Sequence, residues 1–142
     1  MRLMDLTPDF HGVWPCNRIP ELRENSSFII NTDPENKPGE HWVAIFIEGK
    51  KLFFFDSFGR RIDEFSNPFK SIMNQYSKDY TVVVESKYLQ NIFSDTCGYW
   101  TIYYIFCKIC RVEKAFDHFT KNTLLNETIL DEQLEYLDIK NS

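Results

Sequence analysis

The fold is decided by the stretch Gln90-Asn-Ile-Phe-Ser-Asp-Thr-Cys97-Gly98-Tyr-Trp-Thr-Ile-Tyr-Tyr-Ile-Phe-Cys-Lys-Ile-Cys110. A polar loop leads into the Cys-Gly pair, and an apolar segment of helix length follows at once. This layout predicts that Cys97 lies in the first turn of a buried helix, where unpaired backbone N–H groups and the helix dipole favour negative charge. The thiol is therefore expected to ionise readily. Gln90 carries an amide that can donate a hydrogen bond near the same place.

Length and composition indicate one globular domain with an aromatic core. The chain has 142 residues, which predicts a single domain over residues 1–142. Aromatic residues make up 16% of the chain and include 13 Phe, which favours a core of planar side chains. The net charge is −5 and no run of Lys or Arg occurs, so nucleic acid is not an expected partner.

The sequence gives no sign of a membrane or secretory segment. The first residues lack the apolar region of a signal peptide, and no apolar run approaches the length of a membrane span. The chain is therefore expected to be soluble and intracellular, or made in a cell and packaged, and it is not expected to be secreted. In that setting the four cysteines are expected to be reduced.

The first half of the chain is expected to contain an irregular arm and a central hairpin. Residues 1–25 contain three Pro and one Gly, which predicts an arm without regular structure. Residues 27–31 form a strand candidate, and the polar run 33–40 is predicted to be a loop. Two apolar runs, 41–48 and 51–56, are separated by Gly-Lys, which predicts a tight hairpin whose strands are covered on both faces.

The second half supplies the helices. Asn67-Pro68 predicts an N-cap and first turn, with Phe69, Ile72, Met73 and Tyr76 on one apolar face. A strand is expected over 80–84, and a C-terminal helix over 129–137 with Leu130, Leu134 and Leu137 on one face. Strands and helices do not alternate regularly, so the fold class is α+β.

The ends of the hairpin supply a base and a carboxylate for the thiol. His41 opens one strand and Asp56 closes its partner, and these ends lie side by side in an antiparallel pair. A carboxylate that binds one ring nitrogen leaves the other to face a nucleophile. If Cys97 packs against this end of the sheet, its backbone N–H and the Gln90 amide can stabilise an oxyanion. Gly98 leaves room for a substrate backbone beside the sulfur.

The ordered set His41-Trp42, Asp56, Gln90 and Cys97-Gly98 resembles the adenovirus-type cysteine proteases, whose clan also contains the SUMO-specific proteases. The likeness covers about residues 10–110 and includes Phe28-Ile-Ile-Asn-Thr, Leu52-Phe-Phe-Phe-Asp-Ser-Phe-Gly, Gly12-Val-Trp14 and Ile19-Pro. Similar enzymes occur in adenovirus-like viruses and in Polinton-type elements.

The resemblance implies an adenain-like fold, in which helices pack on a central, mainly antiparallel sheet. It also implies a cysteine endopeptidase without a cofactor, with His41, Asp56, Gln90 and Cys97 as catalytic residues. The expected substrates are capsid and other virion precursor proteins, cleaved beside glycine. Substrate contacts are expected from four further residues: Gly12, Trp14, Trp42 and Gly98.

The sequence departs from the family pattern at several positions. The acid is Asp56 where adenovirus enzymes have Glu, although other clan members have Asp, and Asn17 stands where relatives often have Asp. Adenovirus enzymes are activated by DNA and by a peptide joined to a cysteine upstream of the catalytic Gln. Residues 80–86 contain no cysteine and the chain is acidic, so neither mode is expected here in that form. A different peptide activator is left open.

Other interpretations of these residues remain. Cys97 alone is compatible with a core cysteine, and Asp56 with an ordinary turn. Cys107-x-x-Cys110 lacks the second ligand pair of a zinc site and favours packing. A solvated helix face is expected for the acidic residues near the C-terminus, Glu127, Asp131, Glu132, Glu135 and Asp138. At the level of function, the alternatives are a ubiquitin-like-modifier isopeptidase or an acetyltransferase of the same clan, and a non-enzymatic virion or host-binding protein that retains the fold.

Overall fold

The computed structural model describes residues 10–19, 21–32, 41–112 and 114–136. The predictions for residues 1–9, for the polar run 33–40 and for Leu137 and Asp138 lie outside these described residues. Five strands and three helices follow in the order β1, β2, β3, β4, α1, β5, α2, α3, with a short 3-10 helix, η2 (Ile62–Glu64), before α1. The α+β class predicted from the sequence is confirmed.

The strands form one sheet in chain order. They are β1 (Phe10–Pro15), β2 (Ser27–Asn31), β3 (Trp42–Glu48), β4 (Lys51–Phe55) and β5 (Thr81–Val84). The two central pairs, β2–β3 and β3–β4, are antiparallel, whereas the outer pairs β1–β2 and β4–β5 are parallel. The sheet is therefore mixed, and antiparallel pairing is confined to its centre.

The predicted hairpin is confirmed, and its turn explains the register of the central strands. Glu48 pairs with Lys51, so only Gly49 and Lys50 lie between the strands. Gly49 has φ +58°, which glycine adopts readily and which a type II′ hairpin turn needs at its first position. This register brings the first residue of β3 and the residue after β4 to the same end of the sheet.

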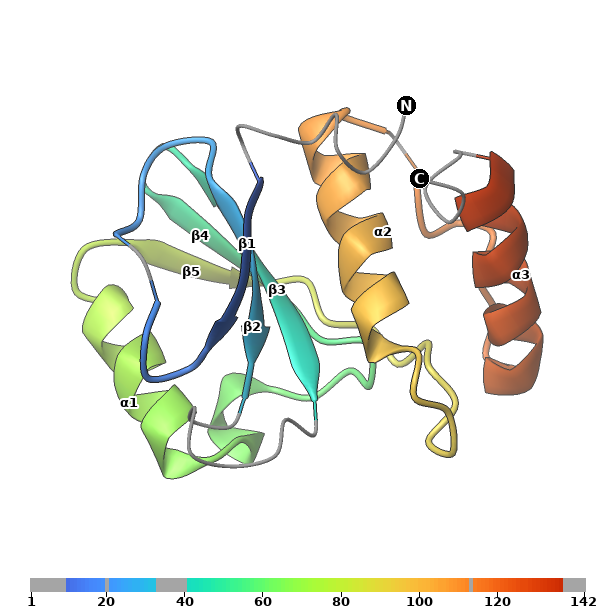
Figure 1. Cartoon of the computed structure of the whole chain (residues 1–142), viewed down its shortest axis with the longest axis horizontal. Coiled ribbons are helices and arrows are strands. Elements are labelled where there is room, and N and C mark those ends of the chain that lie inside the picture. Colours follow the sequence, from blue (N-terminus) through green and yellow to red (C-terminus); the bar gives the residue numbers. More distant parts are fainter. Residues whose placement is uncertain (1–9, 20, 33–40, 113, 137–142) are drawn as a thin grey trace.

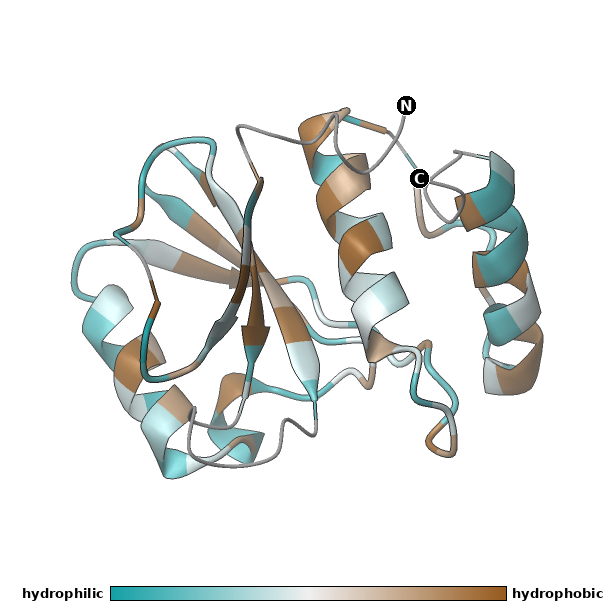
Figure 2. Ribbon diagram, viewed as in Figure 1, coloured by the Kyte–Doolittle hydropathy of each residue, from teal (hydrophilic) through white to brown (hydrophobic). Residues whose placement is uncertain are grey.

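Both faces of the sheet are covered, as the unbroken apolar runs of β3 and β4 predict. Side chains alternate between the faces: Val43, Ile45 and Phe54 join one cluster, and Ala44 and Phe55 the other. Figure 2 shows the hydrophobic residues concentrated in the central strands and on the sides of the helices that face them. These opposed clusters hold the central strands, and hence their ends, in fixed positions.

The helices form layers on the two faces. Helix α1 (Asn67–Tyr76) covers one face, α2 (Cys97–Ile109) covers the other, and α3 (Thr123–Tyr136) lies beyond α2 (Figure 1). Helix α2 is apolar almost all round and has eight buried residues, as expected for a helix between a sheet and another helix. The N-cap of α1 is Ser66, and the helix begins at Asn67. Both lie one residue earlier than predicted, because the sequence favours Asn67 as the N-cap.

Two sequence-based boundaries are wrong. Residues 10–15 form the edge strand β1 instead of an irregular arm, although a register shift between Phe10 and Val13 and the positive φ of Gly12 (+88°) interrupt it. Helix α3 begins at Thr123, six residues before the predicted start at Ile129. Its first turn is capped by Asn122, whose side-chain oxygen accepts from Leu125 N at 3.1 Å.

Candidate functional site

The candidate site lies where three element ends meet. His41 immediately precedes β3, Asp56 immediately follows β4, and Cys97 is the first residue of α2. The His41 carbonyl accepts from Thr32 N at 3.0 Å, which fixes the backbone at the start of β3. All three side chains are buried, with 6% of His41, 0% of Asp56 and 6% of Cys97 exposed. The structure thus brings the predicted base, acid and thiol to one end of the sheet.

Asp56 is held from two sides. One carboxylate oxygen, Oδ1, is hydrogen-bonded to Nε2 of His41. The other, Oδ2, accepts from the backbone N–H of Arg60 at 2.8 Å and from its Nε at 3.3 Å. Burial by itself would raise the pKa of Asp56, but His41 and Arg60 stabilise the carboxylate enough to hold the pKa below its usual value. The aspartate is therefore kept ionised beside the imidazole.

Two phenylalanine rings hold the imidazole and the guanidinium together. The His41 ring stacks on Phe58 and Phe65, with ring centroids 5.0 and 6.3 Å apart. The guanidinium carbon of Arg60 lies 5.3 Å from the centre of the Phe58 ring and 4.7 Å from that of Phe65. Such contacts restrict both side chains to narrow orientations. Arg60 could not be identified from the sequence as a residue of the site. The one hint is its position four residues after Asp56.

The thiol of Cys97 faces backbone N–H groups at the start of α2. Burial raises the pKa of Cys97, while backbone N–H groups of Trp42, Gly98 and Cys97 itself act to lower it, and the charge of Asp56 raises it further. On balance the pKa lies above its usual value. The prediction of a readily ionised thiol is thus wrong for this state, because desolvation outweighs the helix N-terminus. The contact with Trp42 N–H places the sulfur beside the residue that follows His41.

Gln90 is fully buried and oriented by serines. Its Oε1 accepts a hydrogen bond from Ser57 Oγ at 2.6 Å, and its backbone N–H donates to the Ser57 carbonyl at 2.9 Å. Its Nε2 donates to the carbonyl and the hydroxyl of Ser94, at 3.2 and 3.1 Å. Gln90 is therefore tied to Asp56 through the adjacent Ser57, and to the loop that enters α2 through Ser94.

The four predicted substrate contacts are placed differently. A Cβ atom added to Gly98, the residue after the thiol, would meet no heavy atom within 4 Å outside its own stretch of helix, so this position is open. Trp42 contributes the N–H that faces Cys97. Gly12 and Trp14 lie on β1, which β2 separates from β3, and Trp14 packs with the cluster on the face opposite α2. The structure does not bring these last two residues to the thiol, and their role stays a prediction.

Glu127 is not on a solvated face, contrary to the sequence-based expectation. Its Oε1 accepts from Thr96 Oγ1, and its Oε2 accepts from Trp100 Nε1 at 3.0 Å. Helix α3 thus contacts the start of α2 through a carboxylate. A glutamate among other acidic residues in the sequence does not reveal such a contact.

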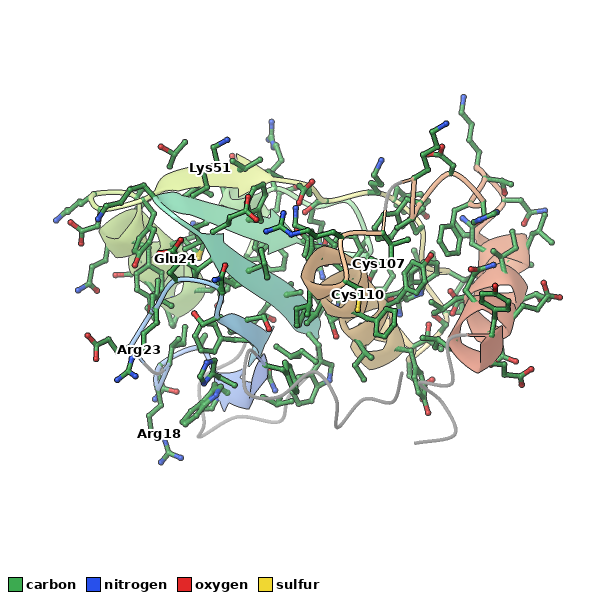
Figure 3. All side chains as sticks on the ribbon, turned by 90° about the horizontal axis from the view of Figure 1, so that it is seen from above. Arg18, Arg23, Glu24, Lys51, Cys107 and Cys110 are labelled. Atoms are coloured by element: carbon green, nitrogen blue, oxygen red, sulfur yellow. The ribbon has the colours of Figure 1, made fainter. Side chains whose placement is uncertain are left out.

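Cys107 and Cys110 lie close together near the end of α2 (Figure 3). Burial is the main cause that raises the pKa of Cys107 to about 12, and no disulfide involves either residue. Within the described ranges, no group of three His, Cys, Asp or Glu side chains is arranged to hold a metal ion. No described helix is long and apolar enough to cross a membrane.

The arrangement as a whole provides the groups that acyl transfer through a thiol requires. With Nε2 of His41 occupied by Asp56, the second ring nitrogen, Nδ1, is the one left to exchange a proton with a thiol. Backbone N–H groups at the start of α2 and the Gln90 amide supply hydrogen-bond donors in the same region.

Comparison with known proteins agrees with this geometry. The protease of Bovine adenovirus 4 is 25% identical over 128 residues, which cover 81% of this chain and 64% of that protein. The protease of Ovine adenovirus D serotype 7 is 26% identical over 118 residues, with 73% of this chain and 58% of that protein covered. For the Bovine adenovirus 7 protease the identity is 25% over 157 residues, with coverage of 94% and 77%.

The chain spans about 64% of the length of the first of these relatives. The family model described as adenovirus endoprotease matches residues 10–135, a region that contains every element of the sheet and all but the last residue of α3. Because this match covers most of the sequence, the chain belongs to the adenovirus endoprotease family.

Proposed function

We propose that residues 1–142 form a single cysteine endopeptidase domain in which Cys97 is the nucleophile and His41 the general base. The observation that carries this proposal is the buried His41–Asp56 pair beside a thiol at the start of a helix. The family match and the viral proteases to which the chain is similar support the same reaction class.

The proposed reaction begins with transfer of the Cys97 proton to Nδ1 of His41. Asp56, ionised and bound to Nε2, stabilises the imidazolium that forms. The thiolate attacks the substrate carbonyl carbon, and the tetrahedral intermediate collapses when His41 gives its proton to the leaving amine. Water, deprotonated by His41, then attacks the thioester and releases the carboxylic acid and the thiol. A raised thiol pKa makes this base necessary.

The oxyanion is assigned to the backbone N–H of Cys97 and the side-chain amide of Gln90. Both acceptors that the Gln90 amide contacts belong to Ser94, so one N–H can be shared between them in a three-centre bond. The second N–H is then available to the oxyanion. Ser57 fixes the amide orientation, because its hydroxyl donates to Oε1 and so keeps the nitrogen on the opposite side.

The proposed substrates are capsid and other virion precursor proteins with glycine beside the scissile bond. The open space at Gly98 supports this, because a substrate backbone without bulky side chains can approach the sulfur there. Trp42 is proposed as a wall of the same channel. The proposed setting is the infected cell and the assembling virion, and a peptide activator remains compatible with the exposed edge of the sheet at β5.

The proposal is tested by cleavage of a proteome-derived peptide library, with the new termini identified by mass spectrometry. The wild-type chain is expected to cleave beside glycine, and Cys97→Ala to leave the library intact. Cleavage of a ubiquitin-like conjugate but not of library peptides would favour the isopeptidase alternative. If neither the wild-type chain nor Cys97→Ala cleaves any substrate, and both bind a virion protein equally well, the non-enzymatic alternative would be favoured.

A further inference from the structure

Glu127 ends a chain of hydrogen bonds that begins at the Gln90 amide. Gln90 Nε2 lies 3.1 Å from Ser94 Oγ, which lies 3.1 Å from Thr96 Oγ1. Thr96 Oγ1 in turn donates to Glu127 Oε1. The chain crosses the whole loop between the predicted oxyanion donor and α2, and it leaves that loop only at a side chain of α3.

The carboxylate fixes the direction of this chain. The Thr96 hydroxyl donates its hydrogen to Glu127 Oε1, so in its contact with Ser94 it can only accept. The single hydrogen of Ser94 Oγ is then shared between Thr96 Oγ1 and the Asn91 carbonyl, which lies 2.8 Å away, in a three-centre bond. The oxygen of this hydroxyl is left to accept from the Gln90 N–H. Ser94 therefore presents lone pairs to the Gln90 amide, and the Thr96 hydroxyl places no hydrogen on Ser94 that would compete with the Gln90 N–H.

Helix α3 is well placed to hold this arrangement. Trp100 Nε1, on a fully buried side chain of α2, donates to the second oxygen of Glu127 at 3.0 Å. The adjacent Asn126 is also fully buried and donates to the Leu89 carbonyl at 3.2 Å. In Figure 1 the loop before α2 and the start of α3 lie at the same end of the molecule. Helix α3 thus contacts the loop at both of its ends, at Leu89 through Asn126 and at Thr96 through Glu127.

We propose that Glu127 is a positioning residue for the oxyanion donor, acting on Gln90 through Thr96 and Ser94. This inference rests on the proposed function, because it assigns Gln90 a role in the same reaction. The role differs from that of a catalytic residue, since Glu127 contacts no reacting atom. The inference extends the site to α3, a helix that supplies none of the predicted catalytic residues.

The test is a double-mutant cycle between Glu127→Gln and Gln90→Ala, measured as kcat and KM for peptide cleavage. The glutamine side chain keeps an oxygen that accepts from Trp100 but presents an N–H to Thr96. The Thr96 hydroxyl then donates to Ser94 instead of accepting from it, and its hydrogen competes with the Gln90 N–H. We expect Glu127→Gln to lower kcat about tenfold with little change in KM, and Gln90→Ala to lower it about hundredfold. In the double variant kcat should equal that of Gln90→Ala, because the effects share one path.

Glu132→Gln, at an exposed position of the same helix, is the matched control and should retain wild-type kcat. In a Cys97→Ala background, NMR signals of the Gln90 side-chain amide should shift with Glu127→Gln and not with Glu132→Gln. Wild-type kcat in Glu127→Gln, multiplied losses in the double variant, or unmoved amide signals would overturn the inference. If the wild-type chain cleaves nothing, the proposed function fails, and the amide signals alone decide the positioning role.

Discussion

At the scale of single residues, Cys97 shows how burial competes with backbone hydrogen bonding. The N–H groups at the start of α2 act on the thiol as expected for a helix N-terminus, yet burial leaves its pKa raised. A thiol in this environment stays protonated near neutral pH unless a neighbour takes the proton. Its reactivity should therefore depend on His41 more strongly than in a site where the helix alone creates the thiolate.

The pH dependence of Cys97 alkylation tests this dependence. In His41→Ala the thiol has no base, so alkylation by iodoacetamide should rise only at alkaline pH, with a midpoint above the ordinary thiol value of 9.0. In the wild-type chain, alkylation near neutral pH should be faster than in His41→Ala, because the imidazole can accept the proton as the sulfur attacks. Rates are followed by mass spectrometry of the Cys97 peptide. Superimposable profiles in the two proteins would contradict the pairing.

Arg60 is expected to affect stability through the charge of Asp56. Because the folded state lowers the pKa of Asp56 below 3.8, this carboxylate contributes stability that is fully present above pH 3.8 and is lost as the pH falls through the folded pKa. Arg60→Gln should reduce the free energy of unfolding near neutral pH by less than about 1 kcal/mol, since the partly exposed guanidinium is screened by solvent. The difference from wild type should shrink below pH 3.8.

Urea unfolding at several pH values measures this effect. Arg61→Gln is the matched control, because the Arg61 side chain is 75% exposed and pairs with the exposed carboxylates of Asp63 and Glu64. It should leave the stability unchanged at every pH. A loss in Arg60→Gln that stays constant down to pH 2 would show that packing on the phenylalanines, and not the charge of Asp56, is responsible.

The sequence predicts the residues of the site whose positions follow from element ends. His41 and Asp56 come together because a two-residue turn sets the register of their strands, and Cys97 is placed by the polar-to-apolar transition before α2. Arg60 and Glu127 could not be predicted in the same way. Arg60 reaches Asp56 across a turn, and Glu127 contacts side chains of another helix. Contacts of this kind leave no periodic pattern of residues in the sequence.

At the scale of elements, the turn after β4 positions the acid. Gly59 N donates to the Asp56 carbonyl at 3.1 Å, so the turn is present, and it carries the carboxylate that is hydrogen-bonded to His41. Gly59 has φ +72°, and a methyl group on it would lie 2.8 Å from Tyr88 N. The turn is therefore packed directly against the segment that leads to Gln90.

Gly59→Ala should destabilise the fold by about 2–4 kcal/mol, from backbone strain together with the clash. Gly49→Ala is the matched control, since Gly49 also has a positive φ (+58°) but nothing lies within 4 Å of the added methyl. It should cost about 1 kcal/mol, from strain alone. Thermal or urea unfolding of both variants measures the difference. Equal losses would show that contact with Tyr88 does not constrain the turn.

Asn126 joins α3 to the segment before Gln90. Its side chain donates to the carbonyls of Leu89 and Thr120 and accepts from Thr120 N at 2.8 Å. Asn126→Ala removes the partner of the buried Leu89 carbonyl and two part-buried bonds to Thr120, so we expect a loss of about 2–4 kcal/mol in the free energy of unfolding. Asn74→Ala, at an exposed position of α1, should cost less than about 0.5 kcal/mol. A similar small loss in both variants would contradict the role of Asn126.

The elements that the sequence analysis misplaced also have physical explanations. Strand β1 contains Gly12 and ends at Pro15, so its propensity favours an irregular chain, and only pairing with β2 makes it a strand. The first turns of α3 bury the polar Asn126, whereas Leu124 is 69% exposed, so the apolar pattern does not mark the true start. In both cases tertiary contacts override the local signal.

At the scale of the whole molecule, the layers converge on one end of the sheet. The hairpin supplies His41 and Asp56, α2 supplies Cys97, and α3 contacts the loop that carries Gln90 (Figure 1). The sheet is buried on both faces, which holds these ends in place without a metal or disulfide among the described residues. The central claim is that this convergence makes Cys97 a nucleophile that depends on His41.

The most direct test of this claim is covalent trapping with a peptide vinyl sulfone ending in Gly-Gly, followed by mass spectrometric mapping of the labelled cysteine. We expect labelling at Cys97 alone, lost in His41→Ala, with Cys16, Cys107 and Cys110 unmodified. Slow and equal labelling of all four cysteines, or labelling of Cys97 that persists unchanged in His41→Ala, would contradict it.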